Sequence, residues 1–180
     1  MESKRRENQD KGFAYYIKEW ILPIVVAFII ATLINKFWFF NIKVPTESMY
    51  PAIVPGDRIL VTRIYKKENL NRGDIIVFHS DELGEDLIKR LIGLPGDKVQ
   101  VKKDGSLYIN GEKREESYVV NQGEKEKEFV VPKDSFLFMG DNRANSLDSR
   151  YWKNPYISKE KIMGKAQFII TPFKRTGKLK

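Results

Sequence analysis

The stretch Val44-Pro45-Thr46-Glu47-Ser48-Met49-Tyr50-Pro51 separates an apolar segment before it from a series of short β-type segments after it. Proline fixes its own φ at about −65° and keeps the preceding residue extended, so Pro45 and Pro51 stiffen the backbone on both sides of Ser48. A nucleophilic serine needs backbone of this kind. Taken alone, the pattern is more typical of an ordinary proline-containing turn after a helix, so its interpretation depends on the neighbouring segments.

The segment before this stretch predicts a membrane-spanning helix. Between Trp20 and Phe40 the only charged residue is Lys36. As a helix, residues 20–40 would measure roughly 31 Å, which is close to the hydrocarbon thickness of a bilayer. Aromatic residues stand at both ends, Trp20 at one and Phe37–Phe40 at the other, as in interfacial belts. We therefore expect a transmembrane anchor over residues 20–40.

The distribution of basic residues predicts the orientation of this anchor. Residues 1–19 hold five lysines and arginines, whereas residues 37–56 hold one. The positive-inside rule then places residues 1–19 in the cytoplasm and residues 41–180 outside the cell membrane. A cleaved secretory signal and a buried core helix are the alternatives. The bulky residues Asn35–Phe40 provide no small-x-small cleavage site, and the aromatic end argues against a core helix.

The composition excludes several kinds of site. Among 180 residues there is no cysteine and one histidine, His79, so disulfides and thiolate chemistry are excluded and a zinc site is disfavoured. We expect neither a metal nor a cofactor. The net charge of +8 is spread along the chain, apart from a basic tail at residues 174–180. Next to a predicted anchor, this charge favours an anionic lipid surface, and we expect no nucleic acid partner.

Residues 41–180 predict one mainly β domain. Three Gly-Asp pairs, a combination that favours turns, each run directly into β-type sequence. Asp104-Gly105 and Asn110-Gly111 are strong hairpin signals. We interpret the charge-rich region 102–132 as a hairpin insertion with a mobile tip, which forms a solvated excursion from the sheet. The predicted fold is mainly β, an antiparallel β-sheet domain with this insertion, preceded by one transmembrane α-helix.

A predicted strand at Asp86–Ile92 supplies a candidate base. Strand alternation places Lys89 on one face between Leu87 and Leu91, where desolvation would lower the pKa of its amine from about 10.4. A neutral amine can take the proton of a serine hydroxyl. On this segment alone, a lysine that buries only its stem is the commoner case. His79 is a rival base, but it closes a β-type segment beside other polar residues, and we expect it to be exposed.

A third block, Phe138–Trp152, is dense in turn-forming polar residues. Such a block forms either an ordered loop that satisfies buried groups, and could hold a catalytic amine, or a cluster of surface turns.

Together these segments resemble the bacterial type I signal peptidase family, membrane-anchored serine proteases with a Ser/Lys dyad. The resemblance covers nearly the whole chain. After the anchor, its motifs occur in the family's order, as Ser48–Pro51, Pro55–Val61, Lys89–Asp97 and Gly140–Arg150. The single anchor and the short insertion are similar to the compact forms of Gram-positive bacteria. The resemblance implies an endopeptidase that removes signal peptides from secreted preproteins after a small-x-small site, typically Ala-x-Ala.

The resemblance also implies individual roles. Ser48 would be the nucleophile and Lys89 the general base, and Ser146 would orient the lysine amine through a hydrogen bond. The Ser48 backbone N–H and the Thr46 hydroxyl would form the oxyanion hole; many members have serine where this chain has Thr46, which keeps the donor.

A supporting network and a substrate surface follow from the same resemblance. Asp148 would pair with Arg150 and Arg90. Many members have an acidic residue where this chain has Ala144. This departure affects the support of the loop and leaves the Ser/Lys dyad unchanged. The shallow pockets for the −1 and −3 side chains would be lined by Ile42, Val44, Met49, Ile53, Leu87 and Ile88.

Two other functions share some of these features. A self-cleaving Ser/Lys repressor would need a DNA-binding module, but residues 1–40 offer an apolar helix. A non-catalytic, membrane-tethered binding domain would keep the fold without the chemistry. For the peptidase, the expected partners are preproteins and the phospholipid bilayer, and the secretion translocon is a further candidate.

Overall fold

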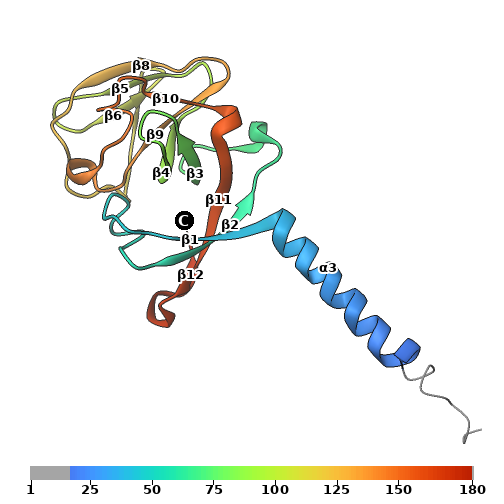
Figure 1. Cartoon of the computed structure of the whole chain (residues 1–180). Coiled ribbons are helices and arrows are strands. Elements are labelled where there is room, and N and C mark those ends of the chain that lie inside the picture. Colours follow the sequence, from blue (N-terminus) through green and yellow to red (C-terminus); the bar gives the residue numbers. More distant parts are fainter. Residues whose placement is uncertain (1–16, 180) are drawn as a thin grey trace, which may run out of the picture. The chain divides into compact units, whose positions relative to one another are not determined.

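The structure, a computed structural model, describes residues 17–179 (Figure 1). The chain divides into two compact units, Met1–Phe39 and Phe40–Lys180. Of the cytoplasmic segment predicted at 1–19, residues 1–16 lie outside the described residues.

Within residues 17–39, the described part of the first unit, the chain forms one apolar helix. A π-helical turn, η1 (Ile17–Ile21), leads into α3 (Leu22–Trp38). Pro23 stands in the first turn of α3, where no intrahelical N–H is required. The 22 residues are long and apolar enough to cross a membrane, and none is buried, whereas the core helix of a soluble protein is mostly buried. The expected helix is therefore present.

The helix ends two residues before the predicted boundary. Phe39 is already extended, with φ −130° and ψ 155°, and begins strand β1 (Phe39–Lys43). Phe40, which the sequence assigned to the aromatic end of the anchor, packs against a core cluster of the second unit. The Arg63 guanidinium lies over its ring, 4.9 Å from the centroid. Phe40 is thus part of the β domain.

The second unit is built on antiparallel sheets, as predicted. The larger sheet has eight strands in the order β1-β2-β11-β3-β4-β9-β10, with β12 paired to β11. The consecutive pairs from β2·β11 to β9·β10 are antiparallel. Its further strands are β2 (Arg58–Arg63), β3 (Ile75–Ser80), β4 (Glu85–Gly93), β9 (Ser135–Met139), β10 (Tyr156–Ser158), β11 (Ile162–Thr171) and β12 (Gly177–Lys178).

A four-stranded antiparallel sheet contains most of the predicted insertion. Its order is β7-β6-β5-β8, with β5 (Lys98–Val101), β6 (Leu107–Ile109), β7 (Glu112–Arg114) and β8 (Lys127–Val130). Both predicted hairpins are confirmed: Asp104-Gly105 joins β5 to β6 and Asn110-Gly111 joins β6 to β7. Positive φ values of 54° at Asn110 and 87° at Gly111 suit this two-residue turn.

The expectation that residues 102–132 form a solvated excursion is wrong. Apolar side chains of β5, β6 and β8 form a buried cluster with Ile92, Leu137 and Met139, which belong to β4 and β9 of the larger sheet. In Figure 1, β5, β6 and β8 of the smaller sheet lie beside β9 and β10. In this region alternate residues of the strands are apolar, as a sheet with one buried face requires. The many charged residues between them led the sequence analysis to overlook this pattern.

Short 3-10 turns complete the second unit: η2 (Lys67–Asn69), η3 (Arg143–Asn145), η4 (Lys159–Lys161) and η5 (Phe173–Arg175). Strand β4 is central, because β3 pairs with it on one side and β9 on the other. As the alternation predicted, Leu87 and Leu91 pack in one cluster while Ile88 and Ile92 pack in others.

The packing of the smaller sheet predicts the effect of truncation in β8. Phe129 is buried in the shared cluster, whereas its neighbour Val130 is exposed. We expect Phe129→Ala to lower the free energy of unfolding by about 3–5 kcal/mol, because it removes a buried ring and leaves a cavity. The matched control, Val130→Ala, should cost less than about 0.5 kcal/mol. Urea unfolding of the detergent-solubilised chain measures both, and equal small effects would contradict a shared core.

Candidate active site

The loop between β1 and β2 holds Ser48 in a fixed position. Its two ends are tied together, since the Val44 N–H donates to the Asp57 carbonyl at 3.0 Å and the Gly56 N–H donates to the Val44 carbonyl at 2.8 Å. Met49 and Ile53 are completely buried beneath it. The Asp57 carboxylate accepts hydrogen bonds from the Val54 N–H at 3.0 Å and from Arg175. The stiffness expected from the two prolines is thus reinforced by packing.

Strand β4 brings Lys89 to this serine. The Lys89 Nζ donates to the Ser48 Oγ at 2.5 Å, across 41 residues of sequence. Lys89 is 4% exposed and Ser48 is 6% exposed, so water is almost excluded from the pair. A buried amine next to a buried hydroxyl is the geometry needed for base-assisted nucleophilic attack.

Burial changes the protonation of Lys89. Desolvation lowers the pKa of its amine from 10.5 to about 8, and the carboxylates of Asp148 and Glu85 oppose this shift, while the positive charge of Arg150 adds to it. Desolvation outweighs the attraction because an ammonium ion loses most of its hydration at this position. With a pKa of about 8, about one tenth of the amine is neutral at pH 7.

Thr46 stands at the open side of the pair. Its Oγ1 lies 3.3 Å from the Ser48 Oγ, and the residue is exposed, in contrast to Ser48. A hydroxyl donor so close to the Ser48 hydroxyl would suit an oxygen that becomes negative if Ser48 attacks a carbonyl group.

The loop of residues 140–150, which we call the 140–150 loop, packs against Ser48 through Gly140. A Cβ atom at Gly140 would lie 2.3 Å from the Ser146 Oγ and 2.4 Å from the Ser48 carbonyl oxygen, so no side chain fits. The Asn142 N–H also donates to the Ser48 carbonyl, at 3.1 Å. The sequence motif contained Gly140, but its role depends on this close approach and was not foreseen.

Ser146 does not make the expected hydrogen bond. Its Oγ is buried and has no hydrogen-bond partner among the described residues, and Lys89 instead donates to Ser48. The hydroxyl still packs against Gly140 at the site.

The predicted pair of Asp148 and Arg150 is present. The Arg150 Nε and Nη2 donate to the two Asp148 carboxylate oxygens at 2.9 and 2.8 Å, and both side chains are fully buried. Asp148 also accepts the Gly140 N–H at 3.0 Å. The pair therefore fixes the same glycine that packs against Ser48.

Arg90 forms its ion pair with a different residue from the one predicted. Its partner is Asp141 and not Asp148, and it donates to the Asp141 carboxylate from Nε at 2.8 Å and from Nη2 at 2.6 Å. The strand register explains the difference: Arg90 lies opposite Met139, two residues before Asp141. Burial raises the pKa of Asp141, and the hydrogen bonds and charge of Arg90 oppose this.

Three residues that belong to the site's surroundings were missed by the sequence analysis. Arg143 is buried and pairs with Glu116, while the Tyr118 ring lies under Arg90, 4.0 Å from the guanidinium carbon. Glu116 and Tyr118 come from the region interpreted as a solvated insertion. Nothing in that charged stretch distinguishes Glu116 from the neighbouring Glu115.

Most residues predicted to line the substrate pockets lie together. Val44, Met49, Ile53 and Ile88 are buried in one cluster, and Ile42 is partly buried against it. Leu87 packs instead against a different cluster, because neighbouring residues of a strand point to opposite faces.

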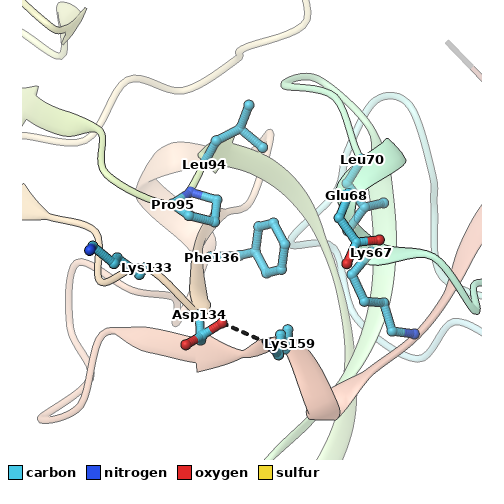
Figure 2. A pocket seen from close by; sticks show the side chains of 9 residues that line it. All are labelled: Lys67, Glu68, Leu70, Leu94, Pro95, Lys133, Asp134, Phe136 and Lys159. Atoms are coloured by element: carbon cyan, nitrogen blue, oxygen red, sulfur yellow. Dashed lines mark hydrogen bonds and ion pairs between the residues drawn. The ribbon is translucent and has the colours of Figure 1, made fainter.

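Other candidate positions lack this chemistry. His79 is half exposed, and its Nδ1 lies 2.8 Å from the Asp86 Oδ1. Its ring therefore pairs with Asp86 and not with Ser48. A separate cavity of about 380 Å³ contains neither Ser48 nor Lys89. Figure 2 shows the ammonium groups of Lys67 and Lys133 at its opposite edges. The cavity is lined by Lys67, Glu68, Leu70, Leu94, Pro95, Lys133, Asp134, Phe136 and Lys159. Within residues 17–179, no group of three or more acidic or histidine side chains could hold a metal ion.

Comparison with known proteins identifies similar chains. Residues 17–171 match the family model "Signal peptidase, peptidase S26". Signal peptidase IB of Staphylococcus aureus strain COL is 37% identical over 177 residues, covering 87% of this chain and 91% of its own. Signal peptidase I P of Bacillus subtilis subsp. natto is 39% identical, covering 91% and 94%. A crystal structure of a signal peptidase I from Enterococcus faecalis V583 is 33% identical, covering 54% of this chain and 96% of that chain with a TM-score of 0.46.

The burial of Lys89 predicts a pH-dependent effect on stability. Between the folded pKa of about 8 and the unfolded value of about 10.4, the unfolded chain binds more protons, so wild-type stability rises with pH. Lys89→Met removes the amine at similar volume and hence this dependence. The difference in the free energy of unfolding, variant minus wild type, should therefore be about 2–3 kcal/mol larger at pH 7 than at pH 10.5.

Urea unfolding at both pH values measures this difference. Lys98→Met is the matched control, since the side chain of Lys98 is exposed, and it should show no such change between the two pH values. A Lys89→Met difference that is the same at pH 7 and pH 10.5 would show that the amine is solvated.

Proposed function

Because the chain belongs to the S26 family of type I signal peptidases and so removes signal peptides, we propose that Ser48 and Lys89 carry out the cleavage as nucleophile and general base. The observation that supports these roles is the 2.5 Å hydrogen bond between two almost completely buried groups. The lowered pKa of Lys89 agrees with them, since a base must be neutral before it accepts a proton.

The first half of the reaction forms an acyl-enzyme. The neutral Lys89 amine takes the Ser48 proton while the Ser48 Oγ attacks the carbonyl carbon of the scissile bond, giving a tetrahedral intermediate and an ammonium ion. The ammonium ion then gives its proton to the leaving amine nitrogen as the C–N bond breaks. The signal peptide stays on Ser48 as an ester, and the mature protein leaves with a new N-terminus.

The second half restores the enzyme. Lys89, neutral again, takes a proton from a water molecule whose oxygen attacks the ester carbonyl carbon. The bond to Ser48 then breaks, the proton returns to its Oγ, and the signal peptide leaves with a carboxylate end. In both tetrahedral intermediates, the Thr46 hydroxyl and the Ser48 backbone N–H stabilise the oxyanion, which the position of the Thr46 Oγ1 near the Ser48 Oγ supports.

The apolar wall beside Ser48 suits a small-x-small cleavage site. Val44, Met49, Ile53 and Ile88 form its buried part, and Ile42 is partly exposed beside them. Because these side chains are closely packed, the wall leaves only shallow pockets. An alanine side chain of the substrate fits such a pocket, whereas a longer side chain would collide with the wall. The preprotein would bind as an extended strand, with main-chain hydrogen bonds supplying affinity.

The proposed setting is the outer face of the cell membrane. The apolar helix is the anchor, and the basic residues before it favour a cytoplasmic N-terminus with residues 41–180 outside. The bilayer is then a partner, and the translocon that delivers preproteins is a candidate for contact. Anchoring raises the effective concentration of a substrate that is itself held in the membrane.

Substitution of either member of the dyad tests the assignment. We expect Ser48→Ala and Lys89→Ala each to reduce kcat at least about 10³-fold, because each removes a group that the reaction requires. The detergent-solubilised chain is incubated with an Ala-x-Ala preprotein, and mass spectrometry defines the new N-terminus. Ser117→Ala and Lys133→Ala replace exposed residues and should cleave normally. Full activity of either dyad variant in a folded chain would refute the proposed roles of nucleophile and base.

The pKa of Lys89 predicts the pH profile of cleavage. Only the neutral amine acts as base, so kcat/KM should rise about tenfold per pH unit up to about pH 8 and then level off. Initial rates with a short Ala-x-Ala peptide between pH 6 and 10 measure this. A profile without a limb near pH 8 would exclude Lys89 as the titrating base.

A further inference from the structure

The connection between β7 and β8 lies along the 140–150 loop. The Val120 N–H donates to the Asp141 carbonyl at 3.0 Å, and the Arg143 N–H donates to the Val120 carbonyl at 3.1 Å. The Ala144 N–H adds a third bond, 2.7 Å to the Asn121 carbonyl. A segment of the smaller sheet therefore pairs with the loop that packs against Ser48.

Side chains of the same connection hold the loop's buried arginine. The Arg143 Nη1 and Nη2 donate to the two Glu116 carboxylate oxygens at 2.9 and 2.6 Å. The Arg143 side chain is 2% exposed and that of Glu116 is 7% exposed. The Tyr118 hydroxyl donates to the same carboxylate at 2.7 Å. A two-point pair of this kind fixes both the position and the plane of the guanidinium group.

Arg143 transmits this constraint to the dyad. Its Nε donates to the Gly140 carbonyl at 3.0 Å, and Gly140 is the residue that packs directly against the Ser146 hydroxyl and the Ser48 carbonyl. From Glu116 to Ser48 there are thus only two intervening residues. A small displacement of the Arg143 guanidinium would therefore move the Gly140 peptide, which packs against Ser48.

We propose that Glu116 is a positioning residue for cleavage, which acts through Arg143 and Gly140 to hold Ser48 in line with Lys89. The proposal rests on the proposed catalytic roles of Ser48 and Lys89. Glu116 touches neither the substrate nor the reacting atoms. Its carboxylate is needed because a buried guanidinium without a counter-charge draws in water or moves toward it, and either response loosens the loop.

Glu116→Gln tests the proposal with a side chain of the same shape. The amide oxygen can accept one of the two bonds, but the charge and the two-point geometry are lost. We expect kcat to fall about 10-fold to 100-fold with KM changed by less than about threefold, because the dyad is misplaced while the substrate wall is intact. Glu116→Asp, which keeps the charge, should recover part of kcat.

The control is the adjacent Glu115→Gln, whose carboxylate is 92% exposed and which should leave both constants unchanged. Thermal unfolding is measured in parallel on the full-length, detergent-solubilised variants. A Glu116→Gln chain that unfolds at lower temperature but keeps the wild-type kcat per folded molecule would show a structural role only and overturn the proposal. Wild-type activity of Ser48→Ala would instead refute the dyad, and so the two failures are distinguishable.

A double variant covers the case in which Glu116→Gln fails to fold. Glu116→Gln with Arg143→Met removes both buried charges, so no unpaired guanidinium remains. If the two residues act through one route, the double variant has the same reduced kcat as Arg143→Met alone. Wild-type kcat in the double variant would overturn the proposal, as would a kcat well below that of Arg143→Met alone.

Discussion

The exclusion of water from one lysine amine is the constraint on which the rest of the structure depends. An ammonium ion at the position of Lys89 loses hydration that no hydrogen bond to a neutral serine replaces, and for this reason its pKa falls to about 8. Keeping the amine in this position requires a rigid strand and a rigid serine loop. Pairing of β4 with β3 and β9 provides the first, and the buried Met49 and Ile53 provide the second.

The charged residues around the dyad are arranged so that they do not reverse this effect. Asp148 lies close enough to attract a proton to Lys89, but it is fully engaged by Arg150. Asp141 is engaged in the same way by Arg90, and Glu116 by Arg143. Asp148 and Asp141 thus each have a guanidinium partner that limits their pull on the Lys89 amine. In these pairs the carboxylates accept hydrogen bonds from the guanidinium N–H groups, and this offsets part of the cost of burying the arginines.

Sequence patterns predicted the elements better than the pairings between them. The apolar run, the hairpin turns and the alternation of β4 are local properties, and the structure has the helix, both hairpins and a buried Lys89. The partner of Arg90 depends on strand register, which no local pattern fixes. Likewise, Glu116 and Glu115 look the same in sequence, and only the fold places one in the interior and leaves the other in water. The smaller sheet was misjudged because its charged residues dominate the composition, while its alternate apolar residues decide its packing.

The graded burial of the apolar wall has a consequence for protein engineering. Val44, Met49 and Ile53 support the serine loop from below, so replacing them to admit a bulkier side chain would also disturb the nucleophile. Ile42 is partly exposed at the edge of the same cluster and carries less of that support. Designers who wish to retarget such a processing enzyme to unusual secretion tags should therefore randomise this one rim position and leave the buried residues unchanged.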